Sequence, residues 1–312
     1  MNVLVIGLGS IATRHIDAVR QLDADAHIYA LRSGRNGKEV NGVRNLYSID
    51  EVAASGIDFA IISNPTSCHA AAVKSLLPLR LPMLIEKPVF DSVSYRQLAV
   101  DLKSARVPNC VACNLRFLDS IEFLRRYISE NDSRRVNEVN VYCGSYLPEW
   151  RKGVSDWRQT YSARRDLGGG VHLDLIHDID YVCSIFGLPV ASRGIVRNVS
   201  TLGIDAADYA NFTLIYPTFC ASVILDYYRR DYKRCCEIVF EDTTWTLDIP
   251  TDKITDSDGN IVFKGNTSVA DTYLLQMRYF MNLVAERRYE CSNDALEACD
   301  ILAISTDYER FD

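Results

Sequence analysis

The sequence lacks any long apolar segment. No uninterrupted apolar run among its 312 residues approaches the ~18–20 residues that span a bilayer. The apolar run at the N-terminus is short, has no basic segment before it, and ends in a glycine turn at Gly7. A secretory signal peptide has a basic segment followed by a longer apolar one. We therefore expect a cytoplasmic protein with no membrane partner.

Positive charge is also scarce. The chain has 34 Lys and Arg residues against 41 Asp and Glu residues, and its net charge is −7. A general nucleic-acid binder has a basic footprint, so this composition argues against nucleic acid as a partner. It leaves room for a local basic pocket.

A second paired cysteine motif is missing, although the chain has ten cysteines. Cys110 and Cys113 form one C-x-x-C pair, and no second pair completes a zinc site. The pair is compatible with a redox motif, but it falls in a predicted buried strand, where free cysteines commonly lie. We expect buried thiols in a reducing cytosol and no disulfides.

A strand, a glycine turn and a helix open the chain. Residues 3–6 are apolar and run into two glycines, after which apolar residues recur with helical spacing. The first glycine allows a sharp turn, and the second lets the backbone approach a pyrophosphate at the helix N-terminus. A plain tight turn can look similar, but the position after an opening strand favours the cofactor site. The predicted binding residues here are Gly7, Gly9, Ser10, Ile11 and Ala12.

The end of the predicted second strand, residues 26–31, indicates which cofactor binds. About 20 residues after the glycines, an Asp or Glu would hold the 2′-hydroxyl of NAD. This sequence has Arg32, Ser33 and Arg35 there instead. Two guanidiniums and a hydroxyl suit a 2′-phosphate, so NADP is favoured over NAD. The alternative is a solvated basic turn.

Three further apolar runs predict buried parallel strands, at residues 58–62, 83–85 and 109–113. Each ends in polar residues, at the strand edge where open α/β sheets bind ligands. For Glu86 and Lys87 the alternative is a surface ion pair. The polar residues concerned are Asn64, Pro65 and His69, then Glu86, Lys87 and Pro88, then Asn114 and Arg116.

The pattern changes near residue 117. Alternating segments then predict a large, mostly antiparallel sheet, with strands at 136–146, 193–200, 207–216, 219–228, 235–241 and 244–249. Helices are predicted at about 171–186 and 270–288, and a last one begins near residue 292. We predict an α/β fold with two domains: a doubly wound parallel sheet at 1–117, and an α+β domain with an open, mostly antiparallel sheet at 118–312.

Candidate catalytic residues follow the triple glycine at 168–170. Asp174 and His177 are one helical turn apart, and an Asp one turn from a His can orient the ring and stabilise its protonated form. A metal site on His172, Asp174 and His177 is an alternative, but no further ligand pair supports it. A structural histidine is the other alternative.

A basic, aromatic loop precedes this segment. Four arginines and a lysine lie within 15 residues, a density that stands out in an acidic protein. Guanidiniums suit carboxylates and phosphates, and aromatic faces suit sugars, so the loop is a candidate substrate site. The alternative is a solvated connection. The loop's residues are Arg151, Lys152, Trp157, Arg158, Tyr161, Arg164 and Arg165.

Together these motifs resemble the Gfo/Idh/MocA family of NAD(P)-dependent oxidoreductases. The resemblance covers essentially the whole chain, from the glycine turn through Glu86-Lys87-Pro88 to the helix with Asp174 and His177. It implies a Rossmann domain, a substrate domain whose sheet often forms oligomers, and sugar or inositol substrates. It also implies that Lys87 lies beside the nicotinamide, that His177 is the acid/base with Asp174 as partner, and that Asn64, Pro65, His69 and Glu86 line the cofactor.

Two positions depart from the family pattern. Many members have Asp and His four residues apart, whereas Asp174 and His177 are three apart, as in a branch met among surface-polysaccharide and unusual-sugar enzymes. The second departure is Arg32-Ser33 in place of an acid. We expect hydride transfer to or from a sugar-like substrate. That substrate is either carboxylated or nucleotide-linked, and it contacts Asn114, Arg116, Trp157, Arg158, Tyr161 and Arg164. A non-catalytic dinucleotide sensor and an enzyme that oxidises its substrate only transiently are the alternatives. A homodimer or homotetramer is expected.

Overall fold

A computed structural model describes residues 1–35, 39–131, 134–150 and 156–308 of the chain. The chain divides into two compact units. The first comprises Met1–Cys113 and Tyr273–Cys299, and the second comprises Asn114–Thr272 and Asp300–Asp312. Within the described residues, no helix combines the length and the apolar character needed to cross a membrane.

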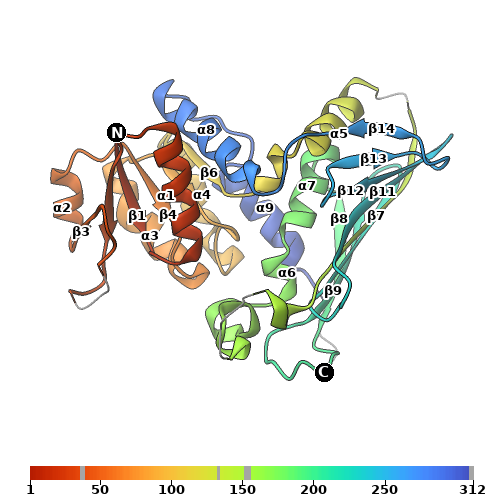
Figure 1. The fold of residues 1–312 in the computed structure, drawn as a ribbon, viewed down its shortest axis with the longest axis horizontal. Helices are drawn as coiled ribbons and strands as arrows, with labels where there is room; N and C mark the ends of the chain where they lie inside the picture. The colour runs from red at the N-terminus through yellow and green to blue at the C-terminus, as the bar shows by residue number, and fades with distance from the viewer. Residues whose placement is uncertain (36–38, 132–133, 151–155, 309–312) are drawn as a thin grey trace. The chain divides into compact units, whose positions relative to one another are not determined.

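The first unit contains a six-stranded parallel sheet (Figure 1). Its strand order is β3-β2-β1-β4-β5-β6, so the order reverses between β1 and β4. This is the doubly wound Rossmann order, and it confirms the predicted fold class. Ligands of such sheets bind at the carboxyl ends of the strands near the reversal. The strands are β1 (Asn2–Ile6), β2 (His27–Leu31), β3 (Val43–Leu46), β4 (Phe59–Ile62), β5 (Met83–Ile85) and β6 (Asn109–Val111).

The α-helices of the first unit follow from their apolar stripes. They are α1 (Ser10–Leu22), α2 (Ile49–Ala54), α3 (His69–Leu76), α4 (Arg96–Ser104) and, from Tyr273 on, α8 (Asp271–Ala285). On α8 the buried residues Met277, Phe280 and Leu283 join the same core as the β1 residues Val3 and Val5. The chain therefore packs α8 into the core of the first unit. The sequence prediction differs here, because it placed all of 118–312 in one domain. As a statement about domains that fold independently, the boundary at 117 stays a prediction.

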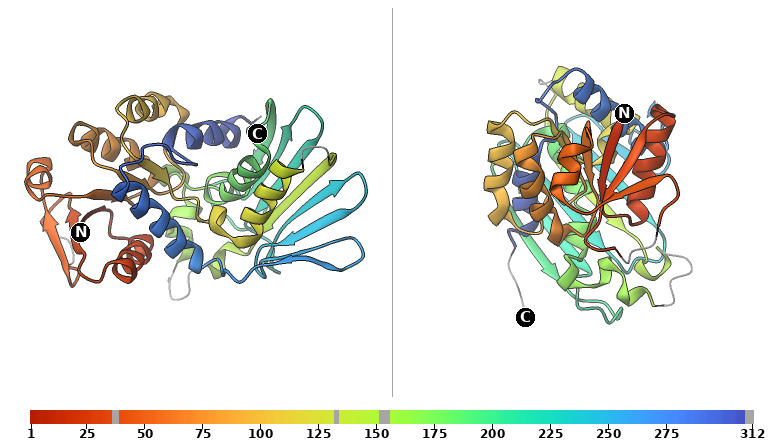
Figure 2. Two further views of the ribbon diagram at one scale, coloured as in Figure 1. Left: turned by 90° about the horizontal axis from the view of Figure 1, so that it is seen from above. Right: turned by 90° about the vertical axis from the view of Figure 1, so that its left-hand side faces the viewer.

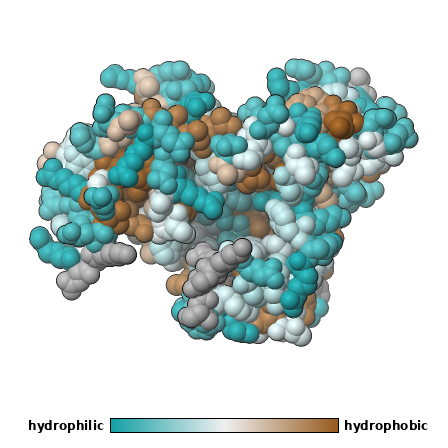
Figure 3. Space-filling model, viewed as in Figure 1, coloured by the Kyte–Doolittle hydropathy of each residue, from teal (hydrophilic) through white to brown (hydrophobic). Residues whose placement is uncertain are grey.

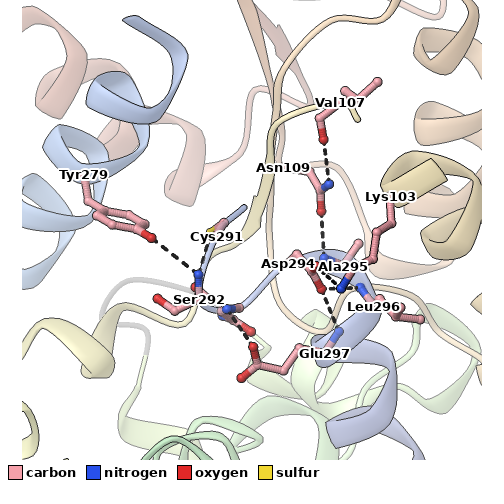
Figure 4. A network of polar contacts seen from close by, with 11 residues as sticks. Lys103, Val107, Asn109, Tyr279, Cys291, Ser292, Asp294, Ala295, Leu296 and Glu297 are labelled. Carbon is pink, nitrogen blue, oxygen red and sulfur yellow. Dashed lines mark hydrogen bonds and ion pairs between the residues drawn. The ribbon is translucent and has the colours of Figure 1, made fainter. Parts of the chain in front are cut away.

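Polar contacts hold the end of the segment Tyr273–Cys299 in the first unit (Figure 4). The Asn109 side chain donates to the Val107 carbonyl at 2.8 Å and accepts from the backbone N–H of Ala295 at 2.7 Å. Asp294 caps the start of α9 (Ala295–Thr306) by accepting from the backbone N–H groups of Leu296 and Glu297.

A disulfide joins Cys110 to Cys291 in the same region, with 6.4 Å between their Cα atoms. The prediction of no disulfides is therefore wrong for this pair. The cause is backbone pairing between β6 and the returning chain. The Val111 N–H donates to the Asn293 carbonyl at 2.9 Å, and the Asn293 side chain donates to the Val111 carbonyl at 2.8 Å. This pairing places the two cysteines opposite each other, which residue spacing along the chain does not show.

The second unit contains an eight-stranded sheet in the order β14-β13-β12-β11-β7-β10-β9-β8 (Figure 2). All neighbouring strands are antiparallel except β7 and β10, which are parallel, so the predicted mostly antiparallel sheet is confirmed. The strands are β7 (Val136–Gly144), β8 (Ala191–Arg197), β9 (Tyr209–Ile215), β10 (Cys220–Asp226), β11 (Lys233–Phe240), β12 (Thr244–Asp248), β13 (Lys253–Thr255) and β14 (Ile261–Lys264).

Helices cover one face of this sheet, as Figure 2 shows. They include α5 (Asp119–Glu130) and α7 (His177–Phe186). The Phe123 ring of α5 stacks on Trp245 of β12 and Phe263 of β14. In Figure 3, brown, apolar side chains show at the end of the unit where α5 and β14 lie, while much of the visible surface is teal.

The helix predicted at 171–186 is broken in two. The short helix α6 (Val171–Asp174) ends before α7 begins at His177, and Leu175 and Ile176 are buried in the break. Asp174 and His177 therefore lie on two helices rather than one turn apart on a continuous helix. Their expected partnership stays a prediction.

Candidate active site

The glycine turn has the geometry that dinucleotide binding requires. Gly7 has φ of +95°, and a Cβ added there would lie 2.4 Å from the Asn64 nitrogen, so this position accepts only glycine. Gly9 caps α1, with open space where a Cβ would lie. No side chain caps this helix and no acidic residue lies in its first turn, which contains Ser10, Ile11 and the buried Ala12. The α1 N-terminus therefore keeps its N–H groups and positive dipole end for an anion.

Glu86 follows β5 and is buried beside this turn. Its Oε1 lies 2.6 Å from His15 Nε2 of α1, and its Oε2 accepts from the Lys87 N–H at 3.2 Å. Burial raises the pKa of Glu86, but the hydrogen bond with His15 and the charges of His15, Lys87 and His69 outweigh it and hold the pKa below its ordinary value. Sequence reasoning missed His15. The signal was a lone histidine on the buried side of α1, six residues after Gly9.

His69 ties together the loops after β4 and β5. Its buried ring places Nε2 2.9 Å from the Asn64 carbonyl oxygen and Nδ1 3.0 Å from the Pro88 carbonyl oxygen. Burial lowers the pKa of His69, and the carbonyl contacts only partly oppose this. Asn64 Oδ1 is buried without a hydrogen-bond partner among the described residues, whereas Pro65 is exposed. An open acceptor beside an uncapped helix N-terminus fits a nucleotide ligand.

The residues predicted to distinguish NADP from NAD lie at the end of β2. The Arg32 N–H donates to the Leu46 carbonyl at 2.9 Å. Ser33 and Arg35 are exposed, and the Arg35 guanidinium lies over the Tyr47 ring, 4.7 Å from its centroid. An exposed, stacked guanidinium is able to meet a phosphate. The predicted cofactor residues of the first unit therefore gather at the carboxyl edge of β1, β2, β4 and β5.

In the second unit, Asp174 is held by a tyrosine that sequence reasoning missed. The Tyr227 hydroxyl donates to Asp174 Oδ2 at 2.9 Å. Burial, followed by the charge and hydrogen bond of Asp174, raises the pKa of Tyr227 well above its ordinary value, so this phenol stays protonated. His177 is the first residue of α7 and is partly exposed. Tyr227 follows β10 immediately, but nothing in its local sequence points to Asp174.

Two buried ion pairs fix α7. Asp178 accepts from Arg234 of β11 at 2.6 and 3.1 Å. Asp180 accepts from two nitrogens of Arg116, each at 2.8 Å. Arg116 was predicted to bind substrate, and the structure shows it paired with a buried carboxylate. Asn114, another predicted substrate residue, is buried and donates to Thr272 Oγ1 at 2.7 Å.

The basic loop folds into short 3-10 helices between Trp157 and Leu167. Three of its side chains contact residues of the same segment. Arg158 lies over the Trp157 ring at 4.5 Å, Arg164 pairs with Asp166 at 2.5 Å, and the Tyr161 hydroxyl donates to the Gly168 carbonyl at 2.9 Å. Arg151 and Lys152, named in the sequence analysis, lie outside the described residues. Among the residues that are described, no group of three His, Cys, Asp or Glu has a metal-site arrangement.

The chain's first 107 residues match the model of an oxidoreductase family with an NAD-binding Rossmann fold, Gfo/Idh/MocA. The match ends at residue 107 of 312 and lies within the first unit. The resemblance seen in the sequence is thereby confirmed for the unit that contains the glycine turn, Asn64, Glu86 and Lys87.

Relatives and solved structures extend the comparison. The chain is 23% identical over 211 residues to inositol 2-dehydrogenase 2 of Mycolicibacterium vanbaalenii, a match that covers 64% of this chain and 57% of the relative. A levoglucosan dehydrogenase with NADH and L-sorbose superposes with a TM-score of 0.83 at 13% identity, covering 98% of this chain and 94% of that one. UDP-N-acetylglucosamine 3-dehydrogenase GnnA of Acidithiobacillus ferrooxidans gives 0.76 at 19% identity, covering 98% and 95%. At these identities the two structures show a shared fold.

Proposed function

We propose that this protein is an NAD(P)-dependent dehydrogenase that transfers a hydride between nicotinamide and a carbinol or keto carbon of a sugar-like substrate. One observation supports this most strongly. Lys87 follows the buried carboxylate of Glu86 at the carboxyl end of β5, on the sheet edge that also holds the open α1 N-terminus. A binding protein that only senses dinucleotide needs no ammonium group there.

The proposed roles follow from the chemistry of each side chain. A bound nicotinamide would supply or accept the hydride. In the oxidising direction, His177 takes the hydroxyl proton and Lys87 stabilises the developing alkoxide by its positive charge. Asp174 stabilises the protonated imidazole, and Tyr227 keeps that carboxylate in position. In the reducing direction the same groups act in reverse.

The cofactor is proposed to be NADP. Arg32, Ser33 and Arg35 offer cations and a hydroxyl at the end of β2, where an acidic residue would select NAD. The levoglucosan dehydrogenase that shares the fold is described with NADH, so calorimetric titration of NADPH against NADH is the direct test. Tighter binding of NADH would overturn the NADP proposal.

The substrate is proposed to be a sugar or sugar derivative with a carboxylate or phosphate, including a nucleotide sugar. The relatives support the sugar class, because they are named as dehydrogenases of inositol, levoglucosan and UDP-N-acetylglucosamine. The proposed substrate-contacting loop comprises Trp157, Arg158, Tyr161 and Arg164. The excess of arginine in an acidic chain supports the anionic group.

We also propose a homodimer or homotetramer that forms through the uncovered face of the eight-stranded sheet. That face exposes Ile195 of β8, of which 39% is accessible, beside Arg193. Light scattering of the purified chain tests this, and a monomer at micromolar concentration would overturn it.

The decisive variant is Lys87→Met, which keeps most of the length of the side chain and removes its charge. We expect kcat to fall by about 10²–10⁴, because an electrostatic and proton-transfer group is lost. Calorimetry should show that the variant still binds the dinucleotide. A variant with wild-type turnover of the same substrate would exclude the catalytic role.

Two alternatives predict different readings from the same assay. A non-catalytic sensor binds dinucleotide and turns over none of the sugars tested. An enzyme that oxidises its substrate only transiently, for elimination or epimerisation, purifies with cofactor bound. It also forms product without a net change in the absorbance of reduced nicotinamide.

A further inference from the structure

The second unit contains a cavity of about 430 Å³ whose described wall includes none of the residues predicted to bind substrate. A volume in this range suits a small-molecule ligand. The wall combines three aromatic rings with three charged groups, from Tyr146, Glu149, Trp150, Arg230, Tyr232 and Arg234.

The cavity adjoins the predicted catalytic segment. Leu175, in the break between Asp174 and His177, forms part of its wall. The Trp150 ring packs edge-on against the Tyr227 ring, with 5.2 Å between centroids, and the Tyr227 hydroxyl is the group bonded to Asp174. A ligand in the cavity therefore contacts Trp150, which packs against the tyrosine that holds Asp174.

The two arginines of the wall differ in whether a carboxylate already neutralises them. Arg234 is neutralised by the buried Asp178, at 2.6 Å. Arg230 is exposed, and its guanidinium lies 3.6 Å from the centroid of the Tyr146 ring. Among the described residues it has no carboxylate partner. A guanidinium stacked by its face on an aromatic ring keeps its N–H edge for a planar or tetrahedral anion.

The remaining wall suits a polyol. Glu149 can accept hydrogen bonds from hydroxyl groups, and the Trp150 and Tyr232 rings offer apolar faces with polar edges. The arginines predicted from the sequence are less suited to an anion. Arg164 already pairs with Asp166, and Arg158 lies over Trp157 outside this wall.

We propose that this cavity binds the anionic group of a pyranose-sized polyol, a carboxylate or a phosphate, through Arg230. The inference rests on the proposed function, because it takes the bound polyol to be the substrate of that reaction. It names Arg230 of the cavity, in place of Arg158 and Arg164, as the residue that selects an anionic sugar.

Calorimetry on the full chain without cofactor tests the proposal. D-glucuronate and D-glucose 6-phosphate serve as the carboxylate and phosphate probes, and D-glucose serves as the neutral control. At least one anion should bind about tenfold or more tightly than glucose, as a charge-assisted hydrogen bond allows. Arg230→Gln should remove that preference, while the matched change Arg125→Gln, at an exposed position on α5, should keep it. The probe that binds more tightly shows whether the cavity prefers a carboxylate or a phosphate.

Three results would overturn the proposal: equal binding of anionic and neutral sugars, a preference that survives Arg230→Gln, or a preference lost in Arg158→Gln instead. This test can fail independently of the proposed reaction, because it measures binding without turnover. If anion binding depends on Arg230 but Lys87→Met leaves turnover intact, the cavity assignment holds and the catalytic one fails. If Lys87→Met abolishes turnover but anion binding ignores Arg230, the reverse holds.

Discussion

At the scale of single residues, Glu86 organises the cofactor side of the candidate site. A buried carboxylate is costly unless it is paired. Here His15 of α1 and the backbone of Lys87 provide the partners, and His69 contributes charge nearby. One side chain thus links the helix that follows the glycine turn to the strand that presents Lys87.

The variant Glu86→Gln should be less stable than the wild type at pH 7 by about 1–3 kcal/mol, because a charge-assisted hydrogen bond is lost. The pKa of Glu86 is lowered in the folded state, so the unfolded chain binds more protons in acid. The stabilisation is therefore complete above the ordinary glutamate pKa and is lost as pH falls through the lowered one.

Urea unfolding at pH 7, 5 and 4 measures both effects. The Gln variant should lose less stability than the wild type over this range. Glu130→Gln, an exposed position at the end of α5, serves as the control and should match the wild type. Equal stability of Glu86→Gln and wild type at pH 7 would refute the assigned role.

At the scale of elements, α7 is fixed by two ion pairs to different neighbours. Asp178 pairs with β11 through Arg234, and Asp180 pairs with Arg116 in the short helix Asn114–Phe117. Both aspartates are almost wholly buried, with 0 and 1% of their side chains accessible. Since His177 begins this helix, the two pairs also position the imidazole.

Replacing Asp180 by Asn should lower the free energy of unfolding by about 3–5 kcal/mol, because the buried Arg116 guanidinium loses the carboxylate that accepts two of its hydrogen bonds. The matched change Asp166→Asn breaks an exposed pair and should leave the unfolding midpoint unchanged. Thermal unfolding of both variants measures this. Equal midpoints for the two would contradict the structural assignment of Arg116 and favour its predicted role toward substrate.

At the scale of the whole molecule, the chain completes its first unit only with residues 273–299. The Phe280 ring of α8 packs edge-on against Phe59 of β4, with 5.3 Å between centroids, and both side chains are fully buried. The first unit is therefore discontinuous in sequence.

Phe280→Ala should destabilise this unit by about 3–5 kcal/mol, the usual cost of removing a fully buried phenylalanine. Addition of dinucleotide should partly restore the midpoint, because the ligand binds the folded unit. Tyr289→Ala, at a position that is 37% accessible, is the control. Thermal unfolding with and without NADPH gives both numbers, and a variant as stable as the control would exclude the assignment of α8 to this core.

Reducing the Cys110–Cys291 disulfide should also lower the stability of the first unit, because it frees residues 273–299 from β6. The pair closes a loop across a sequence separation of 181, for which the chain-entropy account gives about 5 kcal/mol. A Cys291→Ser variant should unfold at a lower temperature than the oxidised wild type and at the same temperature as the reduced protein. Identical midpoints under oxidising and reducing conditions would show that the bond does not form in solution.

Much of this fold could be predicted because its signals are local. The glycine turn, the buried strands and the alternating segments each depend on residues a few positions apart. Contacts over long sequence distances could not be predicted. The partners His15 and Glu86 are separated by 71 positions, and Asp174 and Tyr227 by 53. The apolar stripe of α8 shows that the helix packs, but it does not show against which sheet. The short, half-exposed strand β3 gave no pattern to detect.

The central proposal is that Lys87 and His177 serve one chemical step. The most direct test compares kcat for Lys87→Met, His177→Ala and the double variant on one substrate. When two residues act as a unit, replacing both lowers kcat by far less than the product of the two single-variant factors. We predict that the double variant is about as slow as the slower single variant. Losses that multiply would show that the two side chains act independently, and would contradict the mechanism.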